Sequence, residues 1–293
     1  MPAPSPTTCP DDLLHLLRTP PLLVPGVHDA LSAAMAEQAG FKAVYLSGAA
    51  VAYTRLGSPD IGLVAMTEMA DVLARIRERV ALPIVIDGDT GFGNAIGVQR
   101  TVRAFERAGA SAIQIEDQAF PKRCGHLRQK SLIPAAEMAG KIRAALDARD
   151  ETLIIARTDA IGVEGFAAAL DRAELYREAG ADLIFVEGPE SDEQLAAIVE
   201  RFAGQVPLMA NMVEGGTTPI HTAAELGAMG FSLVIFPGGL VRALSWAAQR
   251  YFASLAEHGT TDPFRDRMFN FTELNQLLGT DAILAKGKLY DGV

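Results

Sequence analysis

The sequence predicts an α/β fold, a (β/α)8 barrel of the TIM type with a C-terminal helical extension. Short apolar runs alternate with longer amphipathic stretches, which is typical of βα units. Small-residue turns recur where the amphipathic stretches lead into apolar runs. Unusual polar residues collect at the ends of the apolar runs, and the chemistry of a barrel lies at the carboxyl ends of its strands. A doubly wound open sheet is the competing fold.

The apolar runs give eight strand candidates, the number in a closed barrel. They are residues 22–25, 43–47, 84–87, 112–116, 153–156, 183–186, 208–211 and 233–236. The helix candidates between and after them are residues 30–40, 67–80, 95–109, 134–148, 165–180, 192–202, 222–230 and 240–255. Four helices run into a glycine turn, at Gly40, Gly109, Gly180 and Gly230. A glycine past a helix end turns the chain back, so the repeated junction indicates one repeated architecture.

The chain is expected to have three parts. Residues 1–21 form an N-terminal leader and arm, residues 22–260 form the barrel, and residues 261–293 form a C-terminal extension. The extension lies beyond the eighth unit, from where it could pack on a neighbouring subunit.

The composition narrows the classes of function. With 293 residues, 49% of them hydrophobic, the chain can bury a large core. A formal net charge of −10 argues against a nucleic-acid partner. Residues 1–10 carry no basic segment, and charges and prolines interrupt residues 13–24, so we expect neither a signal peptide nor a membrane span. Cys9 lies in a Pro/Thr/Ser-rich leader, so we expect no disulfide with Cys124 and a soluble, cytoplasmic protein.

The run Lys122-Arg123-Cys124-Gly125-His126 is the strongest local signal for chemistry. The cations and the histidine favour the thiolate, and the glycine allows close backbone approach. The alternative is a solvated basic loop that carries a cysteine.

Asp87 and Asp89 close the third strand candidate, with Gly88 between them. Residues two apart on a strand point the same way, so both carboxylates can face one pocket. Paired hard oxygen ligands at a barrel mouth suit Mg²⁺ or Mn²⁺. An EF-hand is excluded because its sixth and twelfth positions would be Phe92 and Val98. A plain solvated turn remains the alternative.

Further polar residues follow the fourth to seventh strands. Glu116 is placed to hold metal-bound water or to orient a protonated group, while Asp117 is interpreted as a structural cap of the next turn. Arg157 leaves a buried apolar strand, a placement that needs an anion. A substrate carboxylate or Asp159 could be that partner. Glu187 and Asn211 occupy equivalent strand ends. They could contact hydroxyl or carboxylate groups of a substrate, or they could have purely structural roles.

A divalent cation, an arginine and an activated thiol converge on one predicted mouth. Such a set can stabilise an enolate-like, multiply charged intermediate of a 2-oxo acid. In this hypothesis Cys124 exchanges a proton with carbon, a contribution of roughly 10²–10⁴-fold in rate.

Six segments in order along the chain resemble motifs of the isocitrate lyase/phosphoenolpyruvate mutase superfamily. They are residues 44–49 (Val-Tyr-Leu-Ser-Gly-Ala), 56–60 (Leu-Gly-Ser-Pro-Asp), 87–93 (Asp-Gly-Asp-Thr-Gly-Phe-Gly), 114–118 (Gln-Ile-Glu-Asp-Gln), 122–126 (Lys-Arg-Cys-Gly-His) and 156–160 (Ala-Arg-Thr-Asp-Ala). The resemblance runs from about residue 22 to about residue 279.

This resemblance implies a Mg²⁺-dependent barrel enzyme, with Mn²⁺ as the other suitable ion, that acts on a small molecule. It also implies a homotetramer whose C-terminal helices are exchanged between subunits. Asp87 and Asp89 would lie at the metal, with Glu116 nearby. The implied substrate-binding residues are Ser47, Gly48, Ala49, Gly125, Arg157, Glu187, Asn211, Arg242 and Phe271. The implied catalytic residues are Cys124 as acid/base, with Lys122, Arg123 and His126 of its loop, and Tyr45 and Asp60, which assist deprotonation or close the site.

Three positions point to one branch of the superfamily. The loop cysteine resembles its carbon–carbon lyases. Phe271 stands where members that cleave 2-methylisocitrate have a carboxylate-binding arginine, and Gln114 replaces a histidine. An apolar ring in place of a cation disfavours a third substrate carboxylate. The resemblance therefore predicts retro-aldol or Claisen-type cleavage of a 2-hydroxy-2-methyl dicarboxylate of the 2,3-dimethylmalate type to pyruvate and a short carboxylate. Cleavage of 2-methylisocitrate to pyruvate and succinate, oxaloacetate decarboxylation, phosphonopyruvate chemistry and an inactive barrel scaffold are the alternatives.

Overall fold

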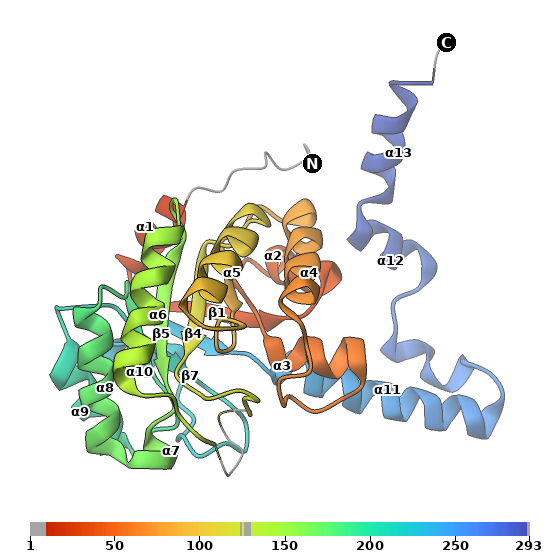
Figure 1. Cartoon of the computed structure of the whole chain (residues 1–293). Helices are drawn as coiled ribbons and strands as arrows, with labels where there is room; N and C mark the ends of the chain where they lie inside the picture. Colours follow the sequence, from red (N-terminus) through yellow and green to blue (C-terminus); the bar gives the residue numbers. More distant parts are fainter. Residues whose placement is uncertain (1–9, 124, 126–129, 292–293) are drawn as a thin grey trace. The chain divides into compact units, whose positions relative to one another are not determined.

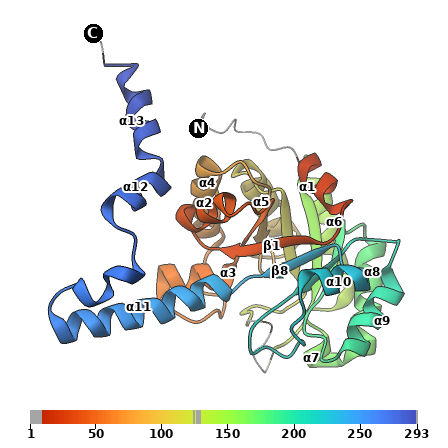
Figure 2. The same ribbon diagram turned by 180° about the vertical axis from the view of Figure 1, so that it is seen from behind.

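The apolar runs form parallel strands in the computed structural model of the chain, which describes residues 10–123, 125 and 130–291. Within these residues each strand pairs with the next, and β8 pairs with β1, so the sheet closes into a barrel (Figure 1). Figure 2 shows β1 and β8 side by side. The strands are β1 (Leu22–Val27), β2 (Val44–Leu46), β3 (Ile84–Asp87), β4 (Ala112–Glu116), β5 (Leu153–Thr158), β6 (Leu183–Val186), β7 (Leu208–Asn211) and β8 (Leu233–Phe236). The predicted barrel is confirmed.

The core has two layers because alternate residues of each strand point to opposite faces. On β3, Ile84 and Ile86 pack outward against the helices, while Val85 packs inward. On β5 the outward residue Ile154 and the inward residue Ile155 follow the same rule. Burial of both faces explains why the strands read as continuous apolar runs.

Helices surround the strands. They are α2 (Ala30–Gln38), α4 (Met66–Arg79), α5 (Ala95–Arg107), α6 (Ala135–Ala148), α8 (Phe166–Glu178), α9 (Asp192–Phe202) and α10 (Ala223–Met229). Of these, α2, α5, α9 and α10 begin at residues whose side chains cap them. Asn94 caps α5 by accepting from Gly97 N at 3.1 Å, and Thr222 caps α10 by accepting from Glu225 N at 3.2 Å. Such caps satisfy backbone donors that a helix start leaves free.

Several short elements were not predicted from the sequence. They are α1 (Pro10–Leu17), α3 (Gly48–Val51), the π-helical turn η1 (Ala52–Leu56) and α7 (Ile161–Glu164). Within the predicted leader and arm, Leu13 and Leu17 of α1 are buried in the inward-facing cluster with Leu22. This part of the N-terminal segment therefore packs on the amino end of the barrel. Strands β1 and β5 also continue to Val27 and Thr158, beyond their predicted ends.

The described chain divides into two compact units, one ending at Val241 and one beginning at Arg242. The boundary falls inside α11 (Gly239–His258). The second unit continues with the 3-10 turn η2 (Asp262–Arg267), α12 (Phe271–Leu278) and α13 (Thr280–Lys288), which confirms the helical extension. Within it the Tyr251 and Phe264 rings pack edge to face, 5.6 Å apart.

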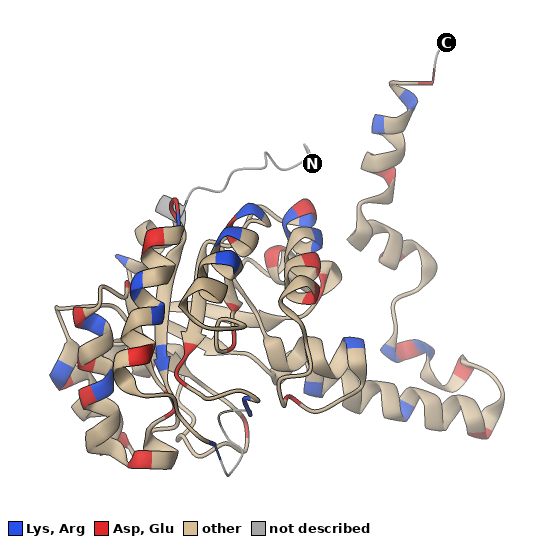
Figure 3. Cartoon of the chain, in the orientation of Figure 1, with Lys and Arg blue, Asp and Glu red and all other residues tan. Residues whose placement is uncertain are grey.

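Both signs of charge are interspersed over the outer helices. Figure 3 shows basic and acidic residues together on α4, α5 and α8. Arg55 and Arg75, for example, both pair with the half-exposed Asp71. No helix in the described residues has the length and apolar character needed to cross a membrane.

Candidate active site

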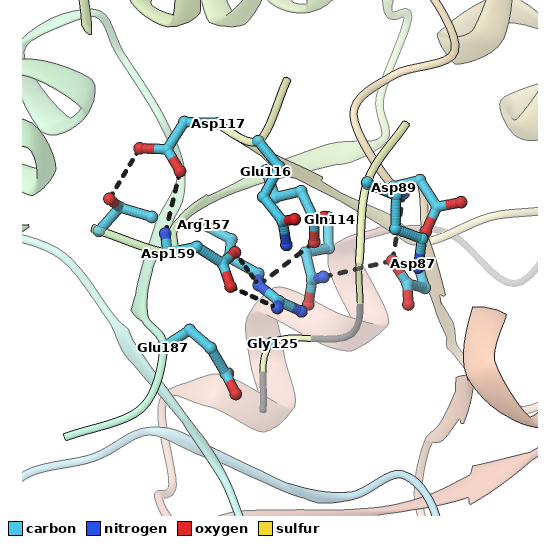
Figure 4. A network of polar contacts seen from close by, with 12 residues as sticks. Asp87, Asp89, Gln114, Glu116, Asp117, Gly125, Arg157, Asp159 and Glu187 are labelled. Carbon is cyan, nitrogen blue, oxygen red and sulfur yellow. Dashed lines mark hydrogen bonds and ion pairs between the residues drawn. The ribbon is translucent and has the colours of Figure 1, made fainter. Parts of the chain in front are cut away.

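Strand alternation delivers polar side chains to one rim of the barrel. On β2, β3, β5, β6 and β7, a buried inward-facing apolar residue is followed two positions later by a polar residue. On β4 the residue two positions before the polar one is Gln114, which is itself polar. The polar residues are Ser47, Asp87, Glu116, Arg157, Glu187 and Asn211. Because the strands are parallel, these residues all lie at the carboxyl end of the barrel. Figure 4 shows Glu116, Gln114 and Arg157 converging there.

Asp87 and Asp89 face the same space beside Gly48. A Cβ atom at Gly48 would lie 3.0 Å from Asp87 Oδ2 and 3.5 Å from Asp89 Oδ1, so glycine lets α3 approach both carboxylates. Gly48 N donates to Asp87 Oδ2 at 3.3 Å. The predicted reason for this pairing was wrong, because β3 ends at Asp87 and Asp89 lies in a left-handed turn with φ 47°. The turn, not strand alternation, brings the two carboxylates together.

Lys122 lies between Asp60 and Asp89 and is buried with them. Its Nζ is 2.5 Å from Asp60 Oδ1 and 2.7 Å from Asp89 Oδ1. Burial by itself would lower the pKa of Lys122, but Asp89 and the neighbouring carboxylates raise that pKa well above its usual value. Burial raises the pKa of Asp89 to about 7, with Lys122 opposing the rise and Asp87 adding to it. Lys122 and Asp60, both predicted as site residues, therefore contact each other, and Lys122 also contacts Asp89 of the paired aspartates.

Arg157 is buried between two carboxylates. Its Nε lies 3.3 Å from Glu116 Oε2, while Nε and Nη2 donate to Asp159 at 2.8 and 3.0 Å. Burial would raise the pKa of Asp159, but Arg157 and then Lys130 lower that pKa to about 2. Burial also raises the pKa of Glu116 well above its usual value, with Arg157 opposing. Of the two partners considered for Arg157, the structure shows Asp159.

Gln114 bridges two predicted site residues in the barrel interior. Its Oε1 accepts from Tyr45 OH at 3.0 Å, and its Nε2 donates to Asp87 Oδ1 at 3.4 Å. Burial raises the pKa of Tyr45 well above its usual value, and Asp87 adds to the rise. The phenol is therefore neutral near pH 7 and serves as a hydrogen-bond donor.

Gly125 and Glu187 lie on another side of the Arg157 guanidinium, and Asn211 contacts Glu187. A Cβ atom at Gly125 would lie 2.5 Å from Arg157 Nη2 and 2.8 Å from Glu187 Oε1, so any larger residue here would displace these two side chains. Asn211 Nδ2 donates to both oxygens of Glu187, at 3.1 and 3.3 Å. The buried Asn211 Oδ1 has no donor among the described residues. This side of the site can therefore accept one further hydrogen bond.

The remaining predicted residues have different placements. Ser47 caps α3 by accepting from Ala50 N at 3.2 Å, and Ala49 follows in that helix. Arg123 is held through its backbone, since Gln118 accepts from its N at 2.9 Å and donates to its O at 2.8 Å. Cys124 and His126 lie outside the described residues. The last two, Arg242 and Phe271, belong to the C-terminal unit, where Phe271 begins α12 and is 86% exposed.

Asp117 has a structural role, although its partners are not those of a turn cap. Its carboxylate accepts from Asp159 N at 2.9 Å, Thr158 Oγ1 at 2.7 Å, Tyr176 OH at 2.8 Å and Arg172 Nη1 at 3.3 Å. Figure 4 shows it directed away from Glu116. Asp117 thereby ties the end of β4 to the end of β5 and to α8.

Lys130 is a site residue that the sequence reading missed. Its Nζ donates to Asp159 Oδ1 at 2.9 Å and to Gly125 O at 2.5 Å. The one signal in the sequence was its place shortly after the basic loop. Its partner Asp159 is 29 residues away, and that pairing requires the fold.

The carboxylates at Asp87, Asp89 and Glu116 fit a divalent cation. Two buried oxygens, Asp89 Oδ1 and Glu116 Oε1, have no hydrogen-bond donor in favourable geometry among the described residues, although Lys122 Nζ is 2.7 Å from Asp89 Oδ1. A cation would neutralise carboxylates whose pKa values burial raises. The described residues do not by themselves bring three protein ligands of the His, Cys, Asp or Glu type around one point. Mg²⁺ needs only one or two carboxylates, because it keeps several waters and takes ligands from the substrate.

The chain is a TIM-type barrel with paired carboxylates and a buried arginine at the carboxyl ends of its strands. Active sites of TIM-barrel enzymes lie at this end, so the fold and the site together define an enzyme of this class. The chain belongs to the phosphoenolpyruvate phosphomutase family, whose match covers residues 13–256. Its sequence is 43% identical to 2,3-dimethylmalate lyase from Eubacterium barkeri, over 92% of this chain and 93% of that protein. It is 46% identical to 2-methylisocitrate lyase from Aeropyrum pernix, over 88% of this chain and 83% of that protein.

Solved structures of the same fold agree with this assignment. A crystal structure of 2,3-dimethylmalate lyase superposes with a TM-score of 0.92 at 35% identity, covering 98% of this chain and 96% of that one. Phosphonopyruvate hydrolase in complex with oxalate and Mg²⁺ superposes with a TM-score of 0.85 at 31% identity, covering 95% of this chain and 98% of that one. The superfamily expected from the sequence motifs is confirmed.

Proposed function

We propose that this protein is a Mg²⁺-dependent carbon–carbon lyase that cleaves a 2-hydroxy-2-methyl dicarboxylate of the 2,3-dimethylmalate type to pyruvate and a short carboxylate. The observation that carries the proposal is the placement of buried Arg157 at the same rim as Asp87, Asp89 and Glu116. A guanidinium can bind a carboxylate through two parallel hydrogen bonds. The likeness to 2,3-dimethylmalate lyase, over 92% of the chain, supports the substrate class.

Asp87, Asp89 and Glu116 would hold the cation, directly or through water. A bound Mg²⁺ would supply positive charge that stabilises the developing negative charge on oxygen. The similarity to phosphonopyruvate hydrolase, whose structure was solved in complex with oxalate and Mg²⁺, supports the choice of ion.

The chain's own residues then bind the substrate and move its protons. Cleavage removes the 2-hydroxyl proton, breaks the C2–C3 bond and leaves the electron pair on C3, which takes up a proton. Carbon 2 becomes the keto carbon of pyruvate. We assign one substrate carboxylate to Arg157, assistance in hydroxyl deprotonation to Asp60 and the proton delivered to C3 to Cys124. Tyr45, held neutral, donates a hydrogen bond rather than accepting the proton.

Pyruvate release measured with a lactate dehydrogenase couple tests the proposal. We expect activity with 2,3-dimethylmalate, its loss in EDTA and its return with Mg²⁺. Replacing Arg157 with Lys keeps the charge but removes the planar fork, so KM should rise more than kcat falls. A protein that releases no pyruvate from any alkylmalate, methylisocitrate or isocitrate is not such a lyase.

Cleavage of 2-methylisocitrate is the second candidate, favoured by the 46% identity to the Aeropyrum pernix enzyme. Buried Gln114 and the apolar Phe271 argue against it, because the additional carboxylate would need a cationic partner. The ratio of kcat/KM for the two substrates decides between them.

We also propose that the active form is a homotetramer with exchanged C-terminal helices. Apolar side chains of α11 and α13 support an assembly, since Trp246, Phe252 and Ile283 are 58%, 64% and 62% exposed. Sedimentation equilibrium should give a mass near four times the 31.1 kDa chain. A monomeric protein with full activity would contradict the assembly alone.

A further inference from the structure

The loop that follows β3 has an unusual backbone. Asp89 and Phe92 have φ values of 47° and 56°, and Gly91 has 82°. Residues with a Cβ atom rarely occupy this left-handed region, because Cβ then crowds the backbone. Such a conformation persists only where surrounding contacts fix it. Asp89, a proposed metal ligand, therefore depends on what holds this loop.

Three successive carbonyl groups of the loop accept hydrogen bonds from three different elements. Asp89 O accepts from Glu116 N of β4 at 2.9 Å. The next two acceptors are served by side chains: Thr90 O by Lys141 Nζ of α6 at 3.0 Å, and Gly91 O by Thr101 Oγ1 of α5 at 2.9 Å. The two side-chain donors come from neighbouring helices of the outer layer, and α5 and α6 pack against each other. The loop is thus tied to the barrel wall at consecutive residues.

Lys141 is the unexpected donor of the three. It is only 5% exposed, although lysine is rarely buried without a partner. An apolar residue would pack between a helix and the sheet without the desolvation of an ammonium group. No salt bridge of Lys141 is found among the described residues, although Glu137, one turn earlier in α6, interacts with its charge. The hydrogen bond from its ammonium group holds the Thr90 carbonyl.

We infer that Lys141 is a positioning residue for the metal site, because its hold on Thr90 O keeps the neighbouring Asp89 in the left-handed conformation that presents its carboxylate beside Asp87. Thr101 supports the same loop one residue further on. The inference rests on the proposed metal site and adds to it a residue from the outer helical layer. Loss of comparable supporting groups around metal ligands weakens metal affinity about 10- to 100-fold.

Charge and position predict opposite results for this lysine. Removing a positive charge near a cation site lowers the repulsion, so electrostatics alone predicts that Lys141→Met binds Mn²⁺ more tightly. Positioning predicts weaker binding. The sign of the change in affinity therefore separates the two effects.

The experiment measures Mn²⁺ dissociation constants by isothermal titration calorimetry on the full chain. We expect Lys141→Met to raise the Kd by about 10-fold or more, and Lys141→Arg, which retains a donor, to recover most of the affinity. Thr101→Val removes one hydrogen-bond donor with almost no change of shape and should raise the Kd to a smaller extent. If Lys141→Met does not fold, the Kd of Thr101→Val still tests the inference.

Arg77→Met is the matched control. Like Lys141, Arg77 is a cationic residue on a helix, α4, that donates to a main-chain carbonyl, here Gly109 O at 2.9 Å. This carbonyl belongs to the glycine turn that leads into β4 and not to the loop that carries Asp89. Its loss should lower thermal stability and leave the Mn²⁺ Kd unchanged. Unchanged or tighter binding by Lys141→Met and Thr101→Val overturns the inference while the metal site stands. If the wild-type chain binds no Mn²⁺ or Mg²⁺, the metal site and the inference both fail.

Discussion

Arg157 and Asp159 face each other at the end of β5 through two hydrogen bonds, from Nε to Oδ2 at 2.8 Å and from Nη2 to Oδ1 at 3.0 Å (Figure 4). Asp159 Oδ1 also accepts a hydrogen bond from Lys130 Nζ at 2.9 Å, and the backbone N–H of Asp159 donates to Asp117 Oδ1 at 2.9 Å. The guanidinium is therefore oriented by a residue that is itself fixed on two sides. This arrangement prepares Arg157 to bind an anion without reorganising.

Asp159→Asn should weaken both stability and substrate binding. The amide keeps the shape but leaves Arg157 and Lys130 without their shared negative charge, and breaking a buried pair costs about 3 kcal/mol. We expect KM to rise more than kcat falls. Urea unfolding and steady-state kinetics measure the two effects. Asp71→Asn, which removes an exposed partner of Arg55 and Arg75, is the control and should have a much smaller effect on stability. Equal effects of the two variants would show that burial of Asp159 contributes nothing.

The same carboxylate predicts a pH dependence of stability. Burial would raise the pKa of Asp159, but Arg157 and Lys130 hold it at about 2, below its value in the unfolded chain. Its contribution, about 2 kcal/mol, is present above about pH 4 and is lost as the pH falls toward about 2. The difference in unfolding free energy between wild type and Asp159→Asn should therefore shrink over that interval. A difference that stays constant from pH 6 to pH 2 would contradict the depressed pKa.

Cys124→Ser should leave the fold intact and reduce kcat by about 10²- to 10⁴-fold. A serine hydroxyl is a far weaker acid than a thiol near neutral pH. Cys9→Ser changes the other cysteine of the chain and serves as the control, with unchanged kinetics expected. Pyruvate formation under single-turnover conditions measures the chemical step. Full activity of Cys124→Ser would remove Cys124 from the proposed mechanism.

Phe271→Arg should shift preference toward the tricarboxylate substrate. The added guanidinium gives a third carboxylate the partner that Phe271 does not offer. The ratio of kcat/KM for 2-methylisocitrate to that for 2,3-dimethylmalate should increase by at least about 10-fold, the effect of one such contact. Phe269→Arg, two residues earlier and also exposed, controls for charge alone. The same ratio in both variants would show that residue 271 does not contact the substrate.

The barrel could be predicted from the sequence because each strand is a short apolar run. The polar residues at the rim could be predicted because they stand at the end of such a run or directly after it. Asp87, Glu116, Glu187 and Asn211 were found for that reason. Contacts between distant segments were not predictable, since Lys122 meets Asp60 across 62 residues and Lys141 meets Thr90 across 51. Nothing in a local pattern identifies such a partner.

The conformation of Asp89 shows a second limit. Alternation along β3 predicted its direction, but the strand stops at Asp87 and the chain turns left-handed. Gly88 and Gly91 lie close to Asp89 in the sequence, but their presence does not fix which residue takes the positive φ. Helix α1 was missed because its burial depends on the open amino end of a barrel that must first form.

The packing of Leu13 and Leu17 on the inner cluster has a consequence for product release. Side chains fill the barrel from α1 upward through Val24, Val85 and Ile155, so its axis offers no exit. If the chain forms two products, both must leave by the opening through which the substrate arrived. The product that lies nearer to that opening then departs first. A high concentration of this first product in solution should rebind and keep the second product in the site.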